Sequence, residues 1–477
     1  MKSKLMNSAW LTDRKINERH CGMVLSEILL AGAIISIALA SCVIVLGSLQ
    51  SMVISSEKNF SAELLARQEI ADLQMVSFEY LKPFTKIKNT TFGDFTADLS
   101  VAYRNPFVAD ISVAVSWYDG EFKKQRTLSQ QVVDWQDADN VSDCGWLNDV
   151  TLNGLKQIDI SAINADMSDL ITDISVQGDI AYVSANGTST SLPDLYVLNV
   201  HDPQKPEIIA SLNTGPGISS IVANGGYVFA ANAGSYQLQV IDVSDPLHPV
   251  LVSQAKLPGV TISGGAGFGK SIAYFGHHVY VGLVKASGPE FHVVDVHEPT
   301  APIALGAFEV GSTVNDISVS QNFATIGTPG IKSVMVLDVS LSQNIKEAGE
   351  TTFIGWQTQG VSSVYILGSQ IYTGRSLGGF YSPNPDLVYL RRDDLSTKVS
   401  ELKIGASIDD VFVYGSYMYL ATNDLVKTFQ MVNVSNNTVI MSSALASRTV
   451  SISCNSRAMY VVTENDQNFF HAFLSNN

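Results

Sequence analysis

The chain has 477 residues and a formal net charge of −16, and 46% of its residues are hydrophobic. This length is enough for more than one domain with a sizeable core. The acidic surplus argues against nucleic-acid binding, because phosphate contacts depend on clustered lysine and arginine. Frequent glycine with a charged fraction of only 16% favours a mainly β protein with many turns.

The N-terminal region consists of a basic leader followed by a long apolar segment. The leader covers residues 1–22 and ends in Gly22. From Met23 to Leu49 almost every residue is apolar or small, and Glu27 is the only charge. The segment is long enough to span a bilayer, which takes about 20 residues. A carboxylate inside it is costly and predicts a partner, such as an amine from another chain.

Gly22, Met23 and Glu27 together resemble the type IV prepilin signal, in which a basic leader ends in Gly and Glu stands five residues into the mature chain. The resemblance implies that a prepilin peptidase cleaves between Gly22 and Met23 and that the new N-terminus is methylated. It also implies that Glu27 pairs with the Met23 amine of another pilin subunit. An uncleaved signal anchor is the alternative, which explains the basic leader but not Glu27.

The helical spacing of apolar residues continues beyond this segment to Pro83, which ends it. Residues 23–83 are therefore predicted as one helix, half membrane-spanning and half amphipathic. From Thr91 the period changes to two. The predicted strands are Phe95–Tyr103, Asp110–Trp117 and Lys123–Val133. The run Ile111–Gly120 resembles the small sheet of minor pilins and pseudopilins, so residues 84–136 are expected to form a pilin-type β-sheet.

The remaining two thirds of the chain is repetitive. One unit is an apolar strand that ends in Asp-Val or Asn-Val, as in Leu195–Val200, Leu238–Val243 and Phe291–Val296. A second unit precedes it by one hairpin, as in Ile171–Ala185. Seven copies at a spacing of about 41 to 53 residues predict a seven-bladed β-propeller over residues 151–477.

Residues 238–259, LQVIDVSDPLHPVLVSQAKLPG, resemble the LVIVD repeat, a propeller-blade family that implies architecture only. The chain ends soon after the third strand of the last copy. We therefore predict that the N-terminal strand Leu155–Ser161 supplies the fourth strand and closes the ring, which removes exposed sheet edges. The acidic stretch before it, residues 137–150, is predicted as a linker.

Four cysteines are present, of which Cys21 lies in the leader and Cys42 in the apolar segment. Cys144 and Cys454 remain for the exported part, where an oxidising compartment favours a disulfide. Ring closure brings the approach to the closing strand near Cys454, so the two cysteines are the candidate bridge. Two unrelated buried thiols are the alternative.

Several patterns suggest chemistry but lack its requirements. Gly264–Ser271 satisfies the P-loop pattern, yet the mechanism needs a helix after the glycines, and here a strand is predicted. Histidines fall in turns of different repeats without metal-ligand spacing. No nucleophile elbow occurs. No catalytic residue, metal site or cofactor is therefore predicted.

The candidate binding surface is the loop Arg375–Asp386, one of the long loops on one face of the predicted ring. Arg375, Phe380 and Tyr381 form an amphipathic set suited to a protein or glycan ligand. A variable loop without function is the alternative.

These features favour a minor type IV pilin at the filament tip, displaying the propeller as a binding or adhesion module. Before assembly we expect it in the inner membrane with the propeller in the periplasm, and afterwards on the pilus at the cell surface. An envelope-anchored propeller enzyme, a hydrolase or lyase, is the alternative from another class, and retention of residues 1–22 would support it. A pseudopilin of a type II-like secretion system is a third possibility.

Overall fold

The computed structural model describes residues 19–74, 84–90, 93–105, 108–133, 144, 146–147, 155–158, 170–186, 192–353, 358–377, 385–445, 447–464 and 468–475. The chain divides into two compact units. The first comprises Met1–Leu73, Pro83–Ser100 and Ser112–Leu128. The second comprises Gln74–Lys82, Val101–Ile111 and Ser129–Asn477.

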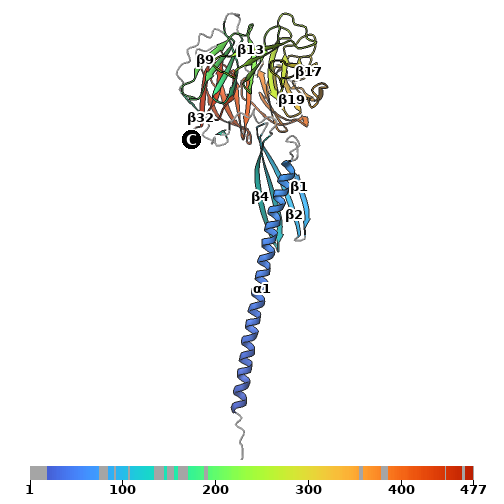
Figure 1. The fold of residues 1–477 in the computed structure, drawn as a ribbon, viewed down its shortest axis with the longest axis vertical. Helices are drawn as coiled ribbons and strands as arrows, with labels where there is room; N and C mark the ends of the chain where they lie inside the picture. Colours follow the sequence, from blue (N-terminus) through green and yellow to red (C-terminus); the bar gives the residue numbers. More distant parts are fainter. Residues whose placement is uncertain are drawn as a thin grey trace, which may run out of the picture. The chain divides into compact units, whose positions relative to one another are not determined.

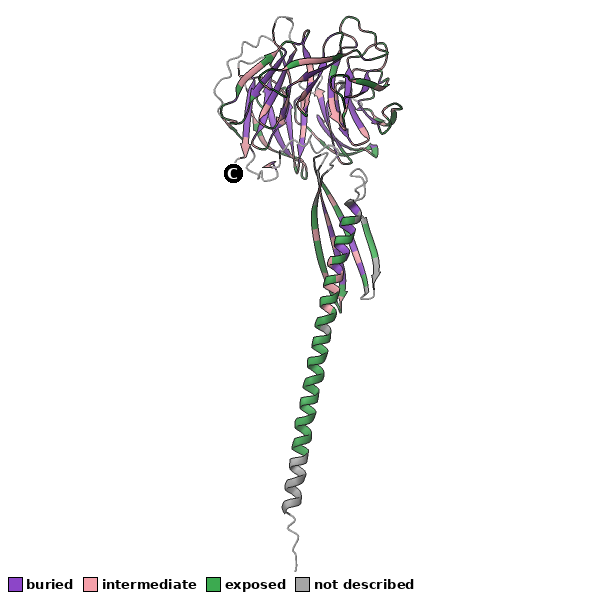
Figure 2. Cartoon of the chain, viewed as in Figure 1, coloured by how far each residue is buried: buried purple, intermediate pink, exposed green. Residues whose placement is uncertain are grey.

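The first unit is built on one long helix, α1 (Arg19–Gln74), of 56 residues. From Leu29 to Ile54 its apolar side chains are exposed, whereas nearer its C-terminal end Leu65, Ile70 and Leu73 are buried (Figure 2). The helix thus has two halves with different surroundings, as predicted from the sequence. The predicted end of the helix at Pro83 lies outside the described residues.

A four-stranded sheet packs on the buried half of α1 (Figure 1). Its strands, in spatial order, are β1 (Phe84–Thr90), β2 (Gly93–Asn105), β3 (Val108–Asp119) and β4 (Phe122–Val133). Alternate residues are buried, such as Phe95 on β2 and Trp117 on β3, whose ring centroids lie 5.8 Å apart. The period of two therefore predicted β2 to β4. It missed β1, because Ile87 is flanked by polar residues and is itself 72% exposed.

The second unit contains seven four-stranded sheets within its described residues. The first three are β6 (Leu170–Gln177), β7 (Ile180–Asn186), β8 (Leu195–Asn199), β9 (Glu207–Leu212); β10 (Ile218–Asn224), β11 (Tyr227–Asn232), β12 (Leu238–Asp242), β13 (Val250–Ala255); and β14 (Gly269–Phe275), β15 (His278–Leu283), β16 (Phe291–Asp295), β17 (Ile303–Phe308). The next two are β18 (Asp316–Ser320), β19 (Phe323–Gly327), β20 (Val334–Asp338), β21 (Lys346–Thr351); and β22 (Thr358–Leu367), β23 (Gln370–Leu377), β24 (Leu387–Arg391), β25 (Asp394–Leu402). The last two are β26 (Ile408–Tyr414), β27 (Tyr417–Thr422), β28 (Phe429–Asn433), β29 (Thr438–Ser443); and β30 (Thr449–Cys454), β31 (Met459–Thr463), β32 (Phe470–Ser475), β5 (Leu155–Ile158).

The core of this unit lies between neighbouring sheets. Leu195 and Val197 on β8, for example, belong to the same buried cluster as Ile218 and Ile221 on β10. Each first strand packs beside the first strand of the next sheet, and β30 packs beside β6. The sheets therefore surround a common centre.

The last sheet takes its fourth strand from the start of the unit. β5 pairs antiparallel with β32, so that Leu155 faces Ser475 and Ile158 faces Ala472. This is the pairing that the strand count of the repeats predicts. It covers the edge of β32, which otherwise exposes unpaired backbone groups.

A disulfide joins Cys144 to Cys454, with their Cα atoms 5.8 Å apart. Trp146 Nε1 donates a hydrogen bond of 2.8 Å to the carbonyl of Asn455, and Leu147 is fully buried in the adjoining core cluster. The linker predicted over residues 137–150 is therefore wrong at Cys144, Trp146 and Leu147, because these side chains pack into or against the core around β30.

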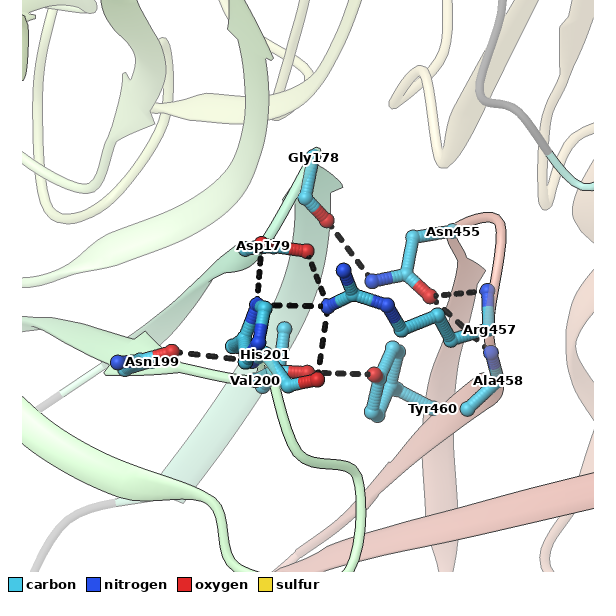
Figure 3. A network of polar contacts seen from close by, with 9 residues as sticks. All are labelled: Gly178, Asp179, Asn199, Val200, His201, Asn455, Arg457, Ala458 and Tyr460. Carbon is cyan, nitrogen blue, oxygen red and sulfur yellow. Dashed lines mark hydrogen bonds and ion pairs between the residues drawn. The ribbon is translucent and has the colours of Figure 1, made fainter.

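Polar contacts between turns join the last sheet to the first (Figure 3). Asn455 Nδ2 donates to the carbonyl of Gly178 at 2.8 Å. The Arg457 guanidinium donates to Asp179 Oδ1 at 2.6 Å and to the carbonyl of His201 at 2.7 Å. The turn after β30 is thus held by the disulfide on one side and by the first sheet on the other.

Candidate functional site

A cavity of about 400 Å³ lies among the first strands of the seven sheets. Every first strand, or the residue directly before it, contributes to the lining, and most of the lining side chains carry hydroxyl, amide or charged groups. The repeat therefore builds this cavity, since the same position in each copy faces the same centre.

β-Bulges select the side chains at this position. In six of the first strands the pairing register with the second strand shifts by one residue near the start of the strand. A bulge leaves one residue unpaired and turns its side chain to a new direction. The residues passed over are Thr172, Ser219, Lys270, Ser362, Asp409 and Val450, and all of them line the cavity.

Carboxyl groups at the same position near the start of three first strands link neighbouring sheets. Asp173 accepts a hydrogen bond of 2.9 Å from the amide of Ile221 on the next first strand. Asp316 accepts one of 2.8 Å from Val364, and Asp410 accepts one of 2.9 Å from Ile452. Each first strand lies at the edge of its sheet, so alternate amides have no partner within that sheet, and these carboxyl groups accept from three of them. The three carboxyls therefore have a structural role first.

The same three carboxyls are hard to ionise. Each lies deep in the ring and is half-buried, with part of its surface open to the cavity. Burial raises the pKa of Asp316 to about 6 and that of Asp410 to about 7, and repulsion between the carboxylates adds to both shifts. Burial also raises the pKa of Asp173. The centre therefore loses negative charge in mildly acidic solution.

The ion pair between Arg448 and Asp409 and the amine of Lys270 complete the lining. Arg448 donates to both Asp409 oxygens, at 2.7 and 2.6 Å, and approaches Glu464 at 3.5 Å. Burial raises the pKa of Asp409, and the hydrogen bonds from Arg448 to Asp409 raise the pKa of Arg448. Lys270 is exposed, and among the described residues its amine has no hydrogen-bond or ion-pair partner. Its charge offsets part of the rise in the pKa of Asp409 that burial causes.

This lining suits hydrogen bonding to a polar ligand, with Lys270 as a charged donor. The hydroxyls of Ser219 and Ser362 and the amide of Asn315 offer both donors and acceptors. Across the described part of the chain, no group of three or more His, Cys, Asp or Glu residues is arranged to hold a metal ion.

The predicted ligand contacts lie elsewhere. Arg375 belongs to β23 and is 5% exposed, because its guanidinium donates to the carbonyl of Pro385 at 2.9 Å and stacks on Phe353 with 5.0 Å to the ring centroid. The prediction that Arg375 is an exposed loop side chain is therefore wrong. Phe380 and Tyr381 lie outside the described residues.

The other predicted residues are distributed as follows. Gly22, Met23 and Glu27 fall within α1. The P-loop-like run Gly264–Ser271 leads into strand β14 rather than a helix, as the sequence predicted. Lys270, the lysine of that run, was not predicted as a cavity residue. The sequence repeat could have identified Lys270, because this lysine occupies the position directly before the Asp or Ser that aligns between the repeats.

The LVIVD repeat family matches residues 218–256 and 405–441. Comparison with curated proteins gives no match. A chain of the mitotic checkpoint complex aligns at a TM-score of 0.50 and 12% identity, covering 68% of this chain and 95% of that chain. The β-propeller domain of Cps50 (Swd1) from Myceliophteria thermophila gives 0.48 and 10% over 68% and 100%. BamB from Moraxella catarrhalis gives 0.42 and 12% over 83% and 98%.

These likenesses concern the fold alone. The repeat matches and the sheets around a common centre define the second unit as a β-propeller.

Proposed function

We propose that this protein is a minor type IV pilin that carries its propeller as a binding module. The observation that supports this most directly is the division of α1 into an exposed apolar half and a half that packs on an antiparallel sheet. Soluble monomers rarely leave an apolar surface of this extent uncovered. The exposed half therefore needs an apolar partner, which the bilayer supplies before assembly and neighbouring pilin helices supply afterwards.

The length and composition of the exposed half suit both partners. The stretch Leu29–Ala71 has a mean hydropathy of 2.7 in its most apolar part and qualifies as a candidate membrane span. No Asp, Glu, Lys or Arg occurs from Ile28 to Ser56. A span of about 20 residues is sufficient to cross the hydrocarbon core.

In this proposal, processing takes place between Gly22 and Met23, and assembly depends on Glu27. Cleavage after Gly22 by a prepilin peptidase makes the Met23 amine the new N-terminus. Glu27 of one subunit then pairs with that amine of its neighbour, which offsets the cost of a carboxylate among apolar helices. The pair sets the register in which the helices pack.

The propeller supplies the binding function. We assign ligand contact to the central cavity, where Lys270 and the bulge hydroxyls lie together. The ligand in this proposal is a surface protein or glycan whose polar groups hydrogen-bond to this lining. A head of this size suits the filament tip, where it does not interrupt helix packing.

Intact-mass analysis of protein extracted from membranes tests the pilin assignment. We expect loss of residues 1–22 and a gain of one methyl group at Met23. A full-length N-terminus would contradict the proposal and favour an envelope protein held by an uncleaved anchor.

A further inference from the structure

The β3–β4 hairpin of the first unit is tied to α1 at one defined level. Ser55 Oγ donates to Asp119 Oδ2 at 3.1 Å, and Lys58 Nζ donates to the carbonyl of Tyr118 at 3.3 Å. Lys124 Nζ binds both Asp119 Oδ2, at 2.6 Å, and Ser55 Oγ, at 3.0 Å. The hydrogen bond from Lys124 lowers the pKa of Asp119, so the contact persists at neutral pH.

Two large aromatic side chains flank this turn without cover. Tyr118 is 65% exposed and Phe122 is 77% exposed. Basic residues follow on β4, where Lys123 and Arg126 are exposed. The turn therefore presents aromatic rings beside positive charges, while Trp117 next to them faces the core.

The level of the hairpin coincides with the end of the uncharged part of α1. The residues Ile28–Ser56 carry no charge, and Glu57 and Lys58 are the first charged ones after them. At 1.5 Å per residue this run is about 43 Å long, against about 40 to 45 Å for a bilayer with its headgroups. A helix that crosses the membrane along this run places Ser55 and Lys58 in the outer headgroup layer.

We propose that the turn of the β3–β4 hairpin, with Tyr118 and Phe122, rests in the headgroup region of the bilayer that α1 crosses. The inference rests on the membrane insertion of α1 in the proposed function. Amphipathic aromatic side chains concentrate at the membrane interface. Lysine and arginine close to the surface are attracted to anionic lipids. The hairpin then fixes the depth and tilt of the helix before assembly.

Depth-dependent fluorescence quenching of the full chain in vesicles tests the proposal. A nitrobenzoxadiazole label is attached to Phe122→Cys in a Cys21→Ser, Cys42→Ser background, in vesicles of phosphatidylcholine and phosphatidylglycerol. The matched control is Thr127→Cys, on the same strand but about 17 Å further from the turn. We expect lipids spin-labelled in the headgroup to quench the Phe122 site several-fold more than the Thr127 site. Omitting phosphatidylglycerol should reduce the difference in quenching between the two sites.

A label on native Cys42, which is exposed on α1, distinguishes failure of membrane insertion from failure of the hairpin proposal. If lipids spin-labelled in the acyl chains do not quench Cys42, α1 does not insert, and both the proposed function and this inference are overturned. If Cys42 is quenched while Phe122 and Thr127 respond alike, only the inference is overturned. A label at the Phe122 site that is shielded from solvent in assembled filaments but not in vesicles would show that a neighbouring subunit covers Tyr118 and Phe122. That result would also overturn the inference.

Discussion

Asp173 Oδ1 accepts a hydrogen bond of 2.7 Å from Ser451 Oγ, although the two residues are 278 positions apart in the chain. Asp173 lies on β6, the first strand of the first sheet, and Ser451 lies on β30, the first strand of the last sheet. The other oxygen of Asp173 accepts hydrogen bonds from Ser220 Oγ and the amide of Ile221 on β10. One carboxyl group therefore joins three neighbouring sheets where the two ends of the propeller meet.

Replacing this carboxyl should weaken the propeller. Asp173→Ala leaves the Ser220 hydroxyl and two backbone amides without their acceptor, and leaves Ser451 only its longer contact with Asp410, at 3.3 Å. We expect a loss of about 2 to 3 kcal/mol in unfolding free energy. Thermal denaturation should show a melting temperature lower by several degrees. Asp202→Ala is the control, because Asp202 is exposed and, among the described residues, its carboxylate accepts one hydrogen bond, from the amide of Gln204 at 3.0 Å. Equal melting temperatures for the two variants would contradict the structural role of Asp173.

The stability of the propeller should fall as pH rises from about 4 to about 7. The pKa of Asp410 is raised to about 7 and that of Asp316 to about 6, above the ordinary value of 3.8. The unfolded chain releases these protons at lower pH than the folded chain, so rising pH favours unfolding in this window. Asp410→Asn, which mimics the neutral acid, should flatten the curve and raise stability at pH 8. The measurement is the melting temperature across this pH range. If the melting temperature of the variant depends on pH as steeply as that of the wild type, Asp410 is not the group that titrates.

The disulfide should contribute strongly to stability. Cys144 and Cys454 are separated by 310 residues, and the chain-entropy account gives about 6 kcal/mol for closing so long a loop. Reduction, or Cys454→Ser, should lower the melting temperature and release Trp146 from Asn455, visible as a change in tryptophan fluorescence. Cys42→Ser should change neither quantity. A reduced protein that melts like the oxidised one would rule out a stabilising role.

Lys270→Ala should reduce ligand binding without affecting the fold. The amine has no partner among the described residues, so we expect the melting temperature to stay unchanged. Loss of one hydrogen bond to a charged group, about 1.5 kcal/mol, corresponds to a roughly tenfold weaker interaction. Adhesion of piliated cells is the measurement, with Lys205→Ala in the exposed turn between β8 and β9 as the control. If both variants adhere like the wild type, the cavity is not the binding site.

Glu27→Ala should separate membrane insertion from assembly. An acid in the bilayer costs about 2.5 to 3.5 kcal/mol on insertion scales, so its removal should leave insertion intact or improve it. Incorporation into filaments should fall, because the Met23 amine of the neighbouring subunit loses its partner. Immunoblotting of sheared filaments and of membranes measures the two quantities. A variant that co-purifies with filaments as well as the wild type does would argue against the pairing.

The sequence by itself determined the elements and their repetition. Helical spacing placed the two halves of α1, the period of two placed β2 to β4, and recurring strands such as Leu238–Val243 revealed the sheets of the second unit. These features are local, because burial of one helix stripe or one strand face fixes the spacing of apolar residues. The strand count also indicated Leu155–Ser161 as the closing strand, since an uncovered edge is unfavourable.

Only the tertiary structure decided which side chains meet. Lys270 and Asp409 are distant in sequence, yet the bulges of β14 and β26 direct both to one cavity. Arg375 has the composition of a binding residue but is buried against Phe353 from the preceding connection. Trp146 and Leu147 follow an acidic, polar stretch and were predicted as linker, but they pack against and into the core. Composition alone does not predict the contacts of Arg375, Trp146 and Leu147, because each depends on how the sheets close around their centre.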